Sequence, residues 1–490
     1  MKPHLFKLGY LPDLPGLRDE DVVWRQLESS NQSISIQAPD LTPTQIEALA
    51  TRVKQASREH LKPMRVSEIV QVIDAAVARL LNQQDPYRQQ LEALLPAVTG
   101  FDAEMVRLNL NAYLQTFRSL QLHRFIAEDF ANPKVLDEFQ PRAAGGWCKA
   151  VGPDLLVHVW AGNVPALSLW SLVSGLLVKS GSIGKVASAE PIFATVFARL
   201  LVEVEPRWRD CLAVVWWQGG DQAQERCAFA AADVVMAYGG NAALQTMQSH
   251  TPITTRFLAH GHKLSLGVVA ATALSVQKSN AVARQAALDV VRYDQQGCYS
   301  PHVFYVQRGA ATSPQEFAHK LAGELSALQH KLPLRDISLE DAASAANWRS
   351  QQELLEMQSS KPHAHQVLGD ASQPWSVVYS DVALPLSPSP LNRNVLVIAV
   401  DALQEIALLI EPQRMYLQTV GLAASPEELL PLSEQLGAVG VTRICALGAM
   451  TSPQAGWHHD GRFSLLDLVR MVDIEQSTEL AAEQFTTYEC

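Results

Sequence analysis

The sequence places a cysteine, Cys298, in a loop that is punctuated by glycine and proline: residues 294–301 are Asp-Gln-Gln-Gly-Cys-Tyr-Ser-Pro. The loop joins a helical pattern to the apolar run Val303–Val306. This position predicts a reachable thiol, because structural cysteines usually sit within helices or strands. A thiol with a pKa of about 8.5 is only about 3% thiolate at pH 7, so a nucleophile here needs local activation. The alternative is a buried thiol that packs as a small hydrophobic side chain.

Two further turns carry polar side chains that could contact a ligand. Asn163 lies in Trp-Ala-Gly-Asn-Val-Pro, residues 160–165. Its amide can point into a cleft at the carboxyl end of a strand, or it can satisfy the backbone of the turn. Lys185 lies in Gly-Lys-Val-Ala-Ser-Ala-Glu-Pro, residues 184–191, which has Val186 where a phosphate-binding loop needs Ser or Thr. The G-x-G-x-x-G dinucleotide fingerprint does not occur in the sequence.

From about Leu155 onward, short apolar runs alternate with helical patterns, which predicts an α/β fold with parallel strands and crossover helices. The expected strands are Leu155–Trp160, Leu212–Trp217, Val234–Tyr238, Leu264–Ala270, Val303–Val306 and Val395–Val400. The segment Ser359–Leu391 is rich in proline and serine, so we expect surface loops there.

The first third of the chain is predicted to be helical. Thr42-Pro43-Thr44-Gln45 has the pattern of a capping box with proline at the first helical position. A second helix is expected from Ser67, where apolar residues recur at helical spacing up to Leu80. A further helical stretch is expected over Phe101–Phe130.

Composition limits the class of protein. The chain has 490 residues, 48% hydrophobic and 18% charged, with a formal net charge of −11, and this length predicts two or three packed domains. Without a basic run, a nucleic-acid partner is not expected. The spacing of the cysteines indicates reduced thiols in the cytoplasm and no metal ligand set. The six cysteines are Cys148, Cys211, Cys227, Cys298, Cys445 and Cys490, the last an exposed-thiol candidate.

The apolar stretch Leu155–Val178 is long enough to be considered as a membrane span. It is interrupted by His158 and by Gly-Asn-Val-Pro at residues 162–165, which break a helix. We therefore expect a buried strand, a tight turn and a buried helix rather than a transmembrane helix. The first seven residues have no continuous apolar core, so no secretory signal is predicted.

Together and in this order, the motifs resemble the acyl-CoA reductase (LuxC-like) family. This family belongs to the aldehyde dehydrogenase superfamily and includes the fatty acid reductase of bacterial bioluminescence. The resemblance covers about Leu155 to Asp473, and its most specific part is the Asp-Gln-Gln-Gly-Cys-x-Ser-Pro motif. Further similar segments are Tyr-Leu-Gln-Thr-Val-Gly at 416–421, Gly-Val-Thr-Arg-Ile at 440–444 and Trp-His-His-Asp-Gly at 457–461.

The resemblance implies an aldehyde dehydrogenase-like α/β fold with a Rossmann-like cofactor domain. A helical N-terminal region over residues 1–150 would pack on an NAD(P)-binding domain over 151–270. A catalytic domain would follow over 271–440, and a C-terminal segment over 441–490 would serve oligomerisation. The implied state is a cytoplasmic homo-oligomer.

The resemblance also implies how a nicotinamide cofactor would bind without the glycine fingerprint. Lys185 would bond the adenosine ribose. Gly239 and Gly240, at a predicted helix start, would let backbone N–H groups approach the pyrophosphate. Ser188 stands where many NAD-dependent relatives have a glutamate. Because a neutral hydroxyl does not repel a 2′-phosphate, NADPH is the expected cofactor, with NADH as the second choice.

The implied reaction is the reduction of a fatty acyl thioester to an aldehyde. The Cys298 thiolate would attack the acyl carbonyl and expel the carrier, which leaves a thioester on the enzyme. The Asn163 amide and the backbone N–H of Cys298 would stabilise the oxyanion. Hydride from the nicotinamide would then give a thiohemiacetal that collapses to the aldehyde. The donor would be a fatty acyl-CoA or an acyl-protein, the latter with a partner acyl-protein synthetase.

One segment departs from aldehyde-oxidising relatives, which have a general-base glutamate just before Gly-Gly-Lys. The comparable stretch, Leu258–Lys263, has no acid. Without a carboxylate to activate water, the acyl-enzyme is expected to survive hydrolysis, with His260 or His262 as an alternative base. His302 and Arg393 fall in family-like motifs, but the sequence gives them no role.

Three other functions stay open at this point. One is a CoA-acylating aldehyde dehydrogenase that works on short acyl groups. Another is a cysteine acyltransferase or thioesterase that binds no nicotinamide. A third is a non-catalytic scaffold, against which the combination of Asn163, Lys185 and Cys298 argues.

Overall fold

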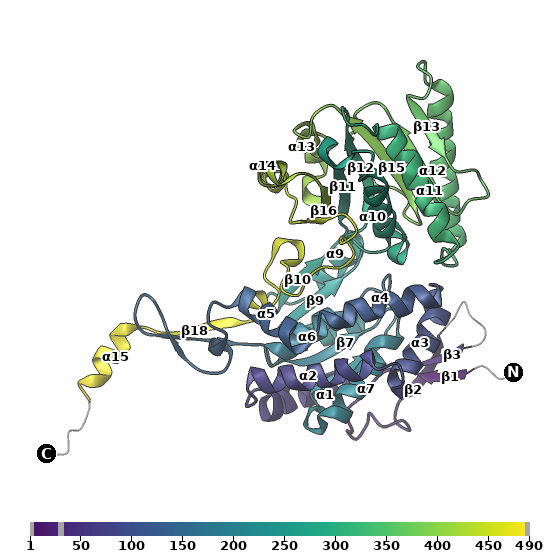
Figure 1. Ribbon diagram of the computed structural model, residues 1–490. Coiled ribbons are helices and arrows are strands. Elements are labelled where there is room, and N and C mark those ends of the chain that lie inside the picture. The colour runs from purple at the N-terminus through teal and green to yellow at the C-terminus, as the bar shows by residue number, and fades with distance from the viewer. Residues whose placement is uncertain (1–3, 28–33, 486–490) are drawn as a thin grey trace.

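The computed structural model describes residues 4–27 and 34–485, so Cys490 lies outside the described residues. The described chain forms two α/β units, each built around a mainly parallel sheet, and a projecting arm (Figure 1). The first unit contains the purple to teal part of the chain and the second contains the green part (Figure 1). The predicted α/β fold is therefore confirmed.

The first unit has a five-stranded parallel sheet in the order β10-β9-β6-β7-β8. Its central strands are almost wholly apolar, as is typical of parallel strands that helices cover on both faces. The strands are β6 (Leu155–Val159), β7 (Gly181–Lys185), β8 (Leu212–Val215), β9 (Val234–Tyr238) and β10 (Arg256–His260). The crossover helices are α6 (Ser168–Leu177), α7 (Ile192–Val204), α8 (Gln222–Ala231) and α9 (Asn241–His250).

The apolar stretch that was considered as a membrane span is β6, a turn and the buried helix α6, as predicted. Within the described ranges, no helix has both the length and the apolar character that crossing a bilayer requires.

Five helices precede this sheet: α1 (Pro43–Ala56), α2 (Val66–Leu81), α3 (Pro86–Thr99), α4 (Ala103–Gln115) and α5 (Ser119–Asp129). Helix α1 begins at the predicted capping box, in which Thr42 and Gln45 bond reciprocally. Helix α2 buries a stripe that includes Ile69, Ile73 and Leu80. The helical prediction is thus confirmed for residues 43–129. Helix α1 packs directly on strands of the five-stranded sheet, whereas α2 and α3 pack on the crossover helix α7 (Figure 1).

The helical prediction is wrong for the described residues within 4–27 and 34–40, whose strands form a small sheet in the order β1-β3-β2. The strands are β1 (His4–Lys7), β2 (Val23–Leu27) and β3 (Ile34–Asp40). In β3, buried Ile34, Ile36 and Ala38 alternate with less buried residues. This period of two is the pattern of a half-buried strand, and it could have identified β3 from the sequence.

The second unit has a seven-stranded sheet in the order β13-β14-β15-β12-β11-β16-β17, in which only β13 is antiparallel to its neighbour. The strands are β11 (Leu264–Val269), β12 (Pro301–Gln307), β13 (His365–Leu368), β14 (Ser376–Ser380), β15 (Asn394–Val400), β16 (Leu417–Ala423) and β17 (Arg443–Ala446). The helices are α10 (Ser279–Val291), α11 (Pro314–Gln329), α12 (Leu339–Gln358), α13 (Glu405–Ile410) and α14 (Pro426–Ala438).

Strands β13 and β14 correct the prediction of surface loops over Ser359–Leu391. All five residues of β14 are buried, and the strand pairs in parallel with β15. The short run Ser-Val-Val-Tyr-Ser was hidden among proline and serine residues, whose turn propensity dominated the prediction.

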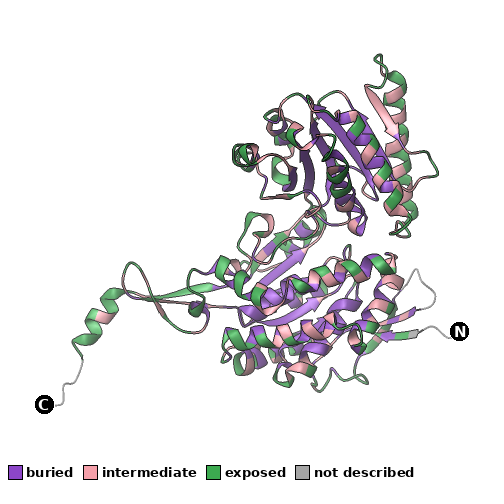
Figure 2. Cartoon of the chain, viewed as in Figure 1, coloured by how far each residue is buried: buried purple, intermediate pink, exposed green. Residues whose placement is uncertain are grey.

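A three-stranded antiparallel arm projects from the first unit (Figure 1). It is made of β4 (Gln140–Pro141), β5 (Trp147–Val151) and β18 (Arg470–Ile474), and it is followed by α15 (Gln476–Glu483). Most of β18 and α15 is exposed (Figure 2).

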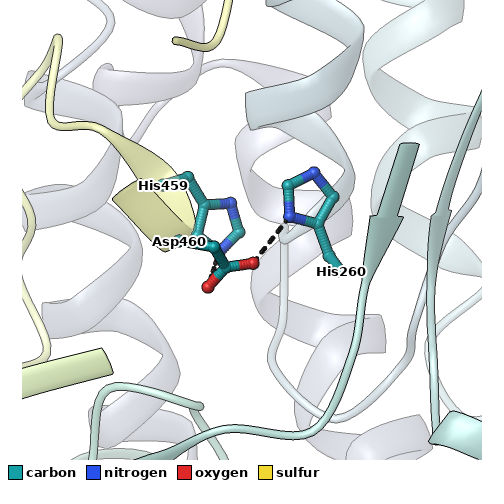
Figure 3. A group of neighbouring side chains, drawn as sticks. All are labelled: His260, His459 and Asp460. Atoms are coloured by element: carbon teal, nitrogen blue, oxygen red, sulfur yellow. Dashed lines mark hydrogen bonds and ion pairs between the residues drawn. The ribbon is translucent and has the colours of Figure 1, made fainter. Parts of the chain in front are cut away.

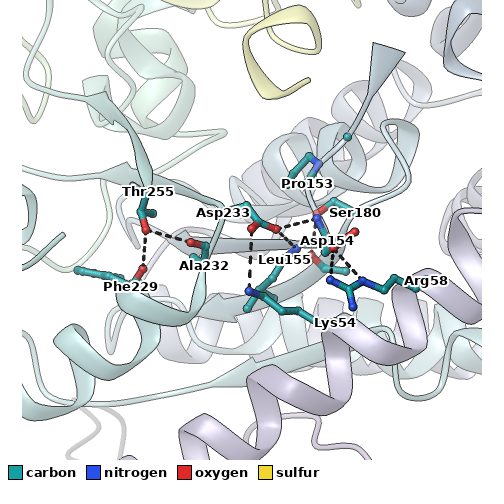
Figure 4. Close-up of polar contacts among 12 residues, drawn as sticks. Lys54, Arg58, Pro153, Asp154, Leu155, Ser180, Phe229, Ala232, Asp233 and Thr255 are labelled. Carbon is teal, nitrogen blue, oxygen red and sulfur yellow. Dashed lines mark hydrogen bonds and ion pairs between the residues drawn. The ribbon is translucent and has the colours of Figure 1, made fainter. Parts of the chain in front are cut away.

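The amino-terminal ends of β6 and β9 are closed by ion pairs with α1 (Figure 4). Asp233 accepts hydrogen bonds from the backbone N–H groups of Asp154 and Leu155, at 2.8 and 3.0 Å. Lys54 lies 3.9 Å from Asp233, and Arg58 lies 2.7 Å from Asp154. Helix α1 therefore covers this edge, and the opposite edge, where the strands end, is left for a ligand site.

Candidate active site

A cavity of about 380 Å³ collects residues from both units. Cys298, Asn163, Gly239 and Gly240 all line it. The turn after β6, the turn after β9 and the loop before β12 therefore meet at this cavity, although Asn163 and Cys298 are 135 positions apart in the sequence. Lys185 and Ser188 are not among the residues that line this cavity.

The loop before Cys298 has an unusual backbone. Tyr293, Asp294 and Gln295 have φ angles of 50°, 49° and 63°, in the left-handed region that non-glycine residues rarely adopt. A second left-handed turn, Leu391–Arg393, has φ angles of 62°, 50° and 65°. The two turns are joined where the Asn392 N–H donates to the Asp294 carbonyl at 3.1 Å. Such conformations persist only when the surroundings fix them.

A fully buried ion pair locks these two turns together. The Arg393 guanidinium donates to the Asp294 carboxylate at 2.7 Å, and neither side chain is exposed. Arg393 also donates to Gln329 at 2.7 Å. Arg393, which had no role from sequence, thus holds the segment that carries Cys298.

The Cys298 side chain is partly exposed, but its surroundings disfavour the thiolate. Burial, with the Asp460 carboxylate nearby, raises the pKa of the thiol to about 11, while a hydrogen bond from Gln418 and the charge of Lys263 oppose this rise. At pH 7 roughly one molecule in ten thousand would then hold a thiolate, far fewer than an unperturbed thiol gives. The thiol is reachable as predicted, and its need for an activating base is greater than predicted.

Asn163 contacts the cysteine loop directly. Its side-chain amide donates to the Gln296 carbonyl at 2.5 Å, which leaves a second N–H free. The turn that holds Asn163 continues to Ala166, whose φ is 65°. The buried Glu190 carboxylate accepts from the Ala166 N–H at 3.4 Å and from the first turn of α7. Glu190 therefore fixes the Asn163 turn to α7.

An acidic residue that sequence inspection did not place in the site lies beside Cys298. Asp460 accepts hydrogen bonds from His260 Nδ1 at 2.9 Å and from Gln418 Nε2 at 2.6 Å (Figure 3). Leu258–Lys263 has no acid, as noted, but the fold brings the Asp460 carboxylate to His260 from 200 residues along the chain. The Trp-His-His-Asp-Gly segment at 457–461 was singled out by resemblance, but its contact with His260 could not be read from the sequence.

His260, His459 and Asp460 offer ligand atoms that lie within 4.8 Å of one another (Figure 3). The two imidazole rings are stacked, with centroids 4.5 Å apart and planes inclined by 10°. His260 Nδ1 already hydrogen-bonds to the Asp460 carboxylate at 2.9 Å, so these two groups satisfy each other without an ion. The arrangement favours a hydrogen-bonded pair over a metal centre.

His302 also lines the cavity, but its hydrogen bonds are structural. Its Nδ1 accepts from the Ser389 N–H at 3.0 Å, and burial lowers its pKa to about 4. A neutral imidazole therefore supports the loop that leads to Arg393.

The glycine turn has room for a ligand. Gly240 is the N-cap of α9, so the predicted helix start is confirmed. A Cβ on Gly240 would meet nothing within 4 Å, and one on Gly239 only Met247 Cε at 3.9 Å. The chain's own packing thus does not require glycine here. The open space in front of a helix N-terminus fits a pyrophosphate.

Lys185 is the last residue of β7, and Ser188 lies three residues later in the turn that follows it. Burial lowers the pKa of Lys185. Ser188 is exposed, and its hydroxyl accepts from Trp216 Nε1 at 3.0 Å. Because residue 188 is a serine and not a glutamate, a phosphorylated ribose would meet a neutral group here.

The remaining wall of the cavity is mainly apolar and aromatic. Helix α4 contributes Ala112 and Tyr113, and the turn and helix at α6 contribute Leu167 and Trp170. The helical first third is therefore part of the site, which the sequence did not predict.

Comparison with known proteins yields one family. The model of the acyl-CoA reductase (LuxC) family matches residues 61–471. A long-chain acyl-protein thioester reductase of Aliivibrio fischeri is 28% identical over 401 residues, which are 81% of this chain and 78% of that one. A long-chain acyl-protein thioester reductase 2 of Photobacterium leiognathi is 25% identical over 461 residues, covering 92% and 90% of the two chains.

Solved structures share the fold at low identity. The aldehyde dehydrogenase KauB from Pseudomonas aeruginosa superposes with a TM-score of 0.74 at 12% identity, covering 96% of each chain. An indole-3-acetaldehyde dehydrogenase complexed with NAD+ gives a TM-score of 0.72 at 10% identity, covering 96% of each chain. The expected aldehyde dehydrogenase-like fold is confirmed.

Proposed function

This chain belongs to the acyl-CoA reductase (LuxC) family, and from that premise we propose that it reduces a fatty acyl thioester, acyl-CoA or acyl-protein, to the aldehyde with NADPH. The observation that carries the proposal is the single cavity shared by Cys298, Asn163 and the Gly239-Gly240 turn, closed by an apolar wall. A nucleophile, an amide donor, a phosphate-sized opening and an acyl-binding surface are thus adjacent.

The chemistry follows from the positions of the chain's own groups. The Cys298 sulfur attacks the acyl carbonyl, the carrier thiol leaves, and the acyl group stays on the sulfur as a thioester. The free N–H of Asn163 and the backbone N–H of Cys298 stabilise the negative oxygen, and one such donor typically contributes about 10²–10³ in rate. NADPH, when bound, supplies the hydride that reduces the acyl carbon. Collapse of the reduced adduct releases the aldehyde and frees the sulfur.

The cofactor would be held by the residues at the ends of β7 and β9. Lys185 would bond the adenosine ribose, and the N–H groups at Gly239 and Gly240 would face the pyrophosphate. We propose NADPH as the preferred cofactor because Ser188 is neutral, and NADH as the weaker one.

A glutamate at position 188 is therefore expected to reverse the cofactor preference. In Ser188→Glu, the carboxylate repels a 2′-phosphate and accepts from ribose hydroxyls, so NADPH should bind about tenfold more weakly and NADH more tightly. Titration calorimetry with each cofactor measures this effect. Ser188→Gln, equal in size and uncharged, serves as the control; an equal loss of NADPH affinity in both variants would contradict an electrostatic origin.

The apolar wall predicts where the acyl chain lies. Ala112 is exposed and lines the cavity, so Ala112→Trp places an indole in the space assigned to the acyl chain. We expect kcat/KM to fall about tenfold for hexadecanoyl-CoA and much less for butanoyl-CoA. Ala103→Trp, an exposed position on the same helix that does not line the cavity, is the matched control. An equal fall in kcat/KM for both substrates would contradict the placement of the acyl chain along this wall.

The direct test of the proposed function is NADPH-dependent formation of aldehyde from a long-chain acyl-CoA, followed by chromatography. Release of free fatty acid without NADPH would support the cysteine thioesterase instead. Turnover restricted to short acyl-CoA would support the CoA-acylating aldehyde dehydrogenase.

We further propose that residues 151–270 bind the cofactor, that 271–440 carry the nucleophile and that the 441–490 segment assembles a homo-oligomer. The arm supports the last point, because three of its large apolar side chains are exposed: Trp147 at 38%, Met471 at 45% and Leu480 at 56%. Exposed apolar groups on a projecting strand pair favour contact with another copy of the chain. An acyl-protein donor would also require a synthetase partner.

A further inference from the structure

A histidine and a carboxylate beside the cavity form a hydrogen-bonded pair that the proposed reaction has not yet used. We propose that His260, oriented by Asp460, is the general base that accepts the Cys298 proton and then protonates the departing carrier thiol. The proposal rests on the proposed function, since it takes Cys298 as the nucleophile.

The hydrogen bond fixes the tautomer of His260. Because Asp460 accepts at 2.9 Å from His260 Nδ1, the proton lies on Nδ1 and the lone pair lies on Nε2 (Figure 3). His260 and Cys298 line the same cavity. A nucleophile, a base with a free nitrogen and a carboxylate that orients the base are the three parts that activate a weak nucleophile.

The ring of His260 is also held by stacking. Its ring lies nearly parallel to those of Tyr238, at 4.6 Å and 14°, and His459, at 4.5 Å and 10°, whose own centroids are 6.1 Å apart. Trp457 packs against His459, with ring centroids 4.7 Å apart and planes inclined by 38°. Four rings from the ends of β9 and β10 and from the Trp457–Asp460 loop thus fix the plane in which Nε2 can point. Asp460 itself has a left-handed φ of 55°, a conformation that persists only where the surrounding structure fixes it.

Two charged side chains line the cavity with His260, the Asp460 carboxylate and the Lys263 ammonium. Burial lowers the pKa of His459 to about 3, so that ring is neutral. Burial raises the pKa of Tyr238 far above its usual value, so the phenol is neutral as well. Burial opposes ionisation of Asp460, but hydrogen bonds from His260 and Gln418 lower its pKa, and it stays a carboxylate.

Asp460 also contacts a second residue of the cavity. Its other oxygen accepts from Gln418 Nε2 at 2.6 Å, and Gln418 lines the cavity with Cys298. The Gln418 Oε1 atom is buried without a partner. Asp460 therefore orients both the base and the Gln418 amide, which makes it a positioning residue.

The proton balance of the transfer is complete without a further reactant. The Cys298 S–H proton moves to His260 Nε2 while the sulfur lone pair forms a bond to the acyl carbon. The bond from that carbon to the carrier sulfur then breaks, and the carrier thiolate takes the proton from Nε2. No group is oxidised or reduced in this step. A positioned base of this kind typically contributes about 10²–10⁴ in rate.

Acylation can be measured alone as the burst of CoA released from hexadecanoyl-CoA without NADPH, followed from about pH 5 to pH 9. In the unaltered enzyme the burst rate should rise through the ionisation of His260 and then level off. His260→Gln should lower the burst rate about 10²–10⁴-fold at pH 7. The remaining rate should rise with pH over the whole range, because it depends on the small fraction of Cys298 thiolate. Added imidazole should partly restore the burst rate of His260→Ala.

His262 lines the same cavity and is the rival base, so His262→Gln separates the two histidines. His319→Gln, at an exposed position on α11 that does not line the cavity, is the matched control. Both variants should keep the levelling pH profile. Asp460→Asn should keep a levelling profile shifted to lower pH, because the imidazolium loses its counter-charge. A His260→Gln enzyme with the original profile, or loss of the profile in His262→Gln, would overturn the proposal.

Failure of the proposed function would look different. If the unaltered enzyme shows no burst, or if Cys298→Ser keeps the burst, the nucleophile itself is misplaced. NADPH affinity, measured by calorimetry on each histidine variant, separates a loss of the proton acceptor from a loss of fold.

Discussion

Replacing Cys298 with serine should abolish the acyl-enzyme and lower aldehyde formation by at least about a thousandfold. The replacement keeps the size of the side chain but removes the polarisable sulfur, and a hydroxyl is much harder to ionise than a thiol. The neighbouring Asp460 carboxylate makes ionisation harder still, since it already helps to raise the pKa of the thiol to about 11. A stopped assay for aldehyde with NADPH and hexadecanoyl-CoA measures the loss.

Cys445→Ser is the matched control. Burial raises the pKa of Cys445 to about 11 as well, but this residue does not line the cavity. Its replacement should leave both acylation and reduction close to those of the unaltered enzyme. Equal losses in the two variants would mean that general damage, rather than removal of the nucleophile, explains the effect.

Removing one partner of the Asp294–Arg393 pair should be the most destabilising single change near the site. Arg393→Met leaves the Asp294 carboxylate buried without its cation, and breaking a buried pair typically costs about 3–5 kcal/mol. The two left-handed turns also lose their side-chain ion pair and keep only the backbone bond from Asn392 to Asp294, so acylation by Cys298 should slow. Urea denaturation followed by circular dichroism, together with the CoA burst, measures both effects.

The double variant Asp294→Asn with Arg393→Met tests the cause. It removes both charges, so it should recover a large part of the stability that the single variant loses. Additive losses in the double variant would contradict the charge-pair explanation. The contact between Arg308 and the exposed Asp401, 2.8 Å long, provides a comparison, because Asp401→Asn removes only a surface charge and should cost about 1 kcal/mol or less.

Much of the α/β scaffold could be predicted from local patterns. The apolar runs from Leu155 onward became parallel strands, and the Thr42 capping box became the start of α1. The cysteine loop and the Asn163 turn were singled out because glycine and proline mark loops. Their meeting in one cavity follows from the edge at which parallel strands end.

The parts of the site and fold that were not predicted depend on contacts between segments that are distant in the sequence. Asp460 reaches His260 and Gln418 from the carboxyl-terminal part of the chain, so no local spacing reveals it. Arg393 and Asp294 are 99 positions apart, and only the structure shows that both are buried. Strand β14 lies in a segment whose prolines and serines indicate loops, and its burial is due to the neighbouring sheet.

The same contacts explain how a poorly ionised thiol could serve as a nucleophile. Burial suppresses free thiolate, which limits side reactions of the sulfur. Asp460 holds both His260 and Gln418 in the cavity that Cys298 lines, so proton removal can occur as the acyl group arrives. A thiol of this kind reacts only when substrate and base are both in place.

The most direct measurement is peptide mass spectrometry after incubation with hexadecanoyl-CoA. We expect a single acyl adduct on the peptide that contains Cys298, and we expect NADPH to remove it as an equal amount of aldehyde forms. Aldehyde that accumulates without this adduct, or an acyl group found on another residue, would contradict the assignment of Cys298 as the acyl carrier.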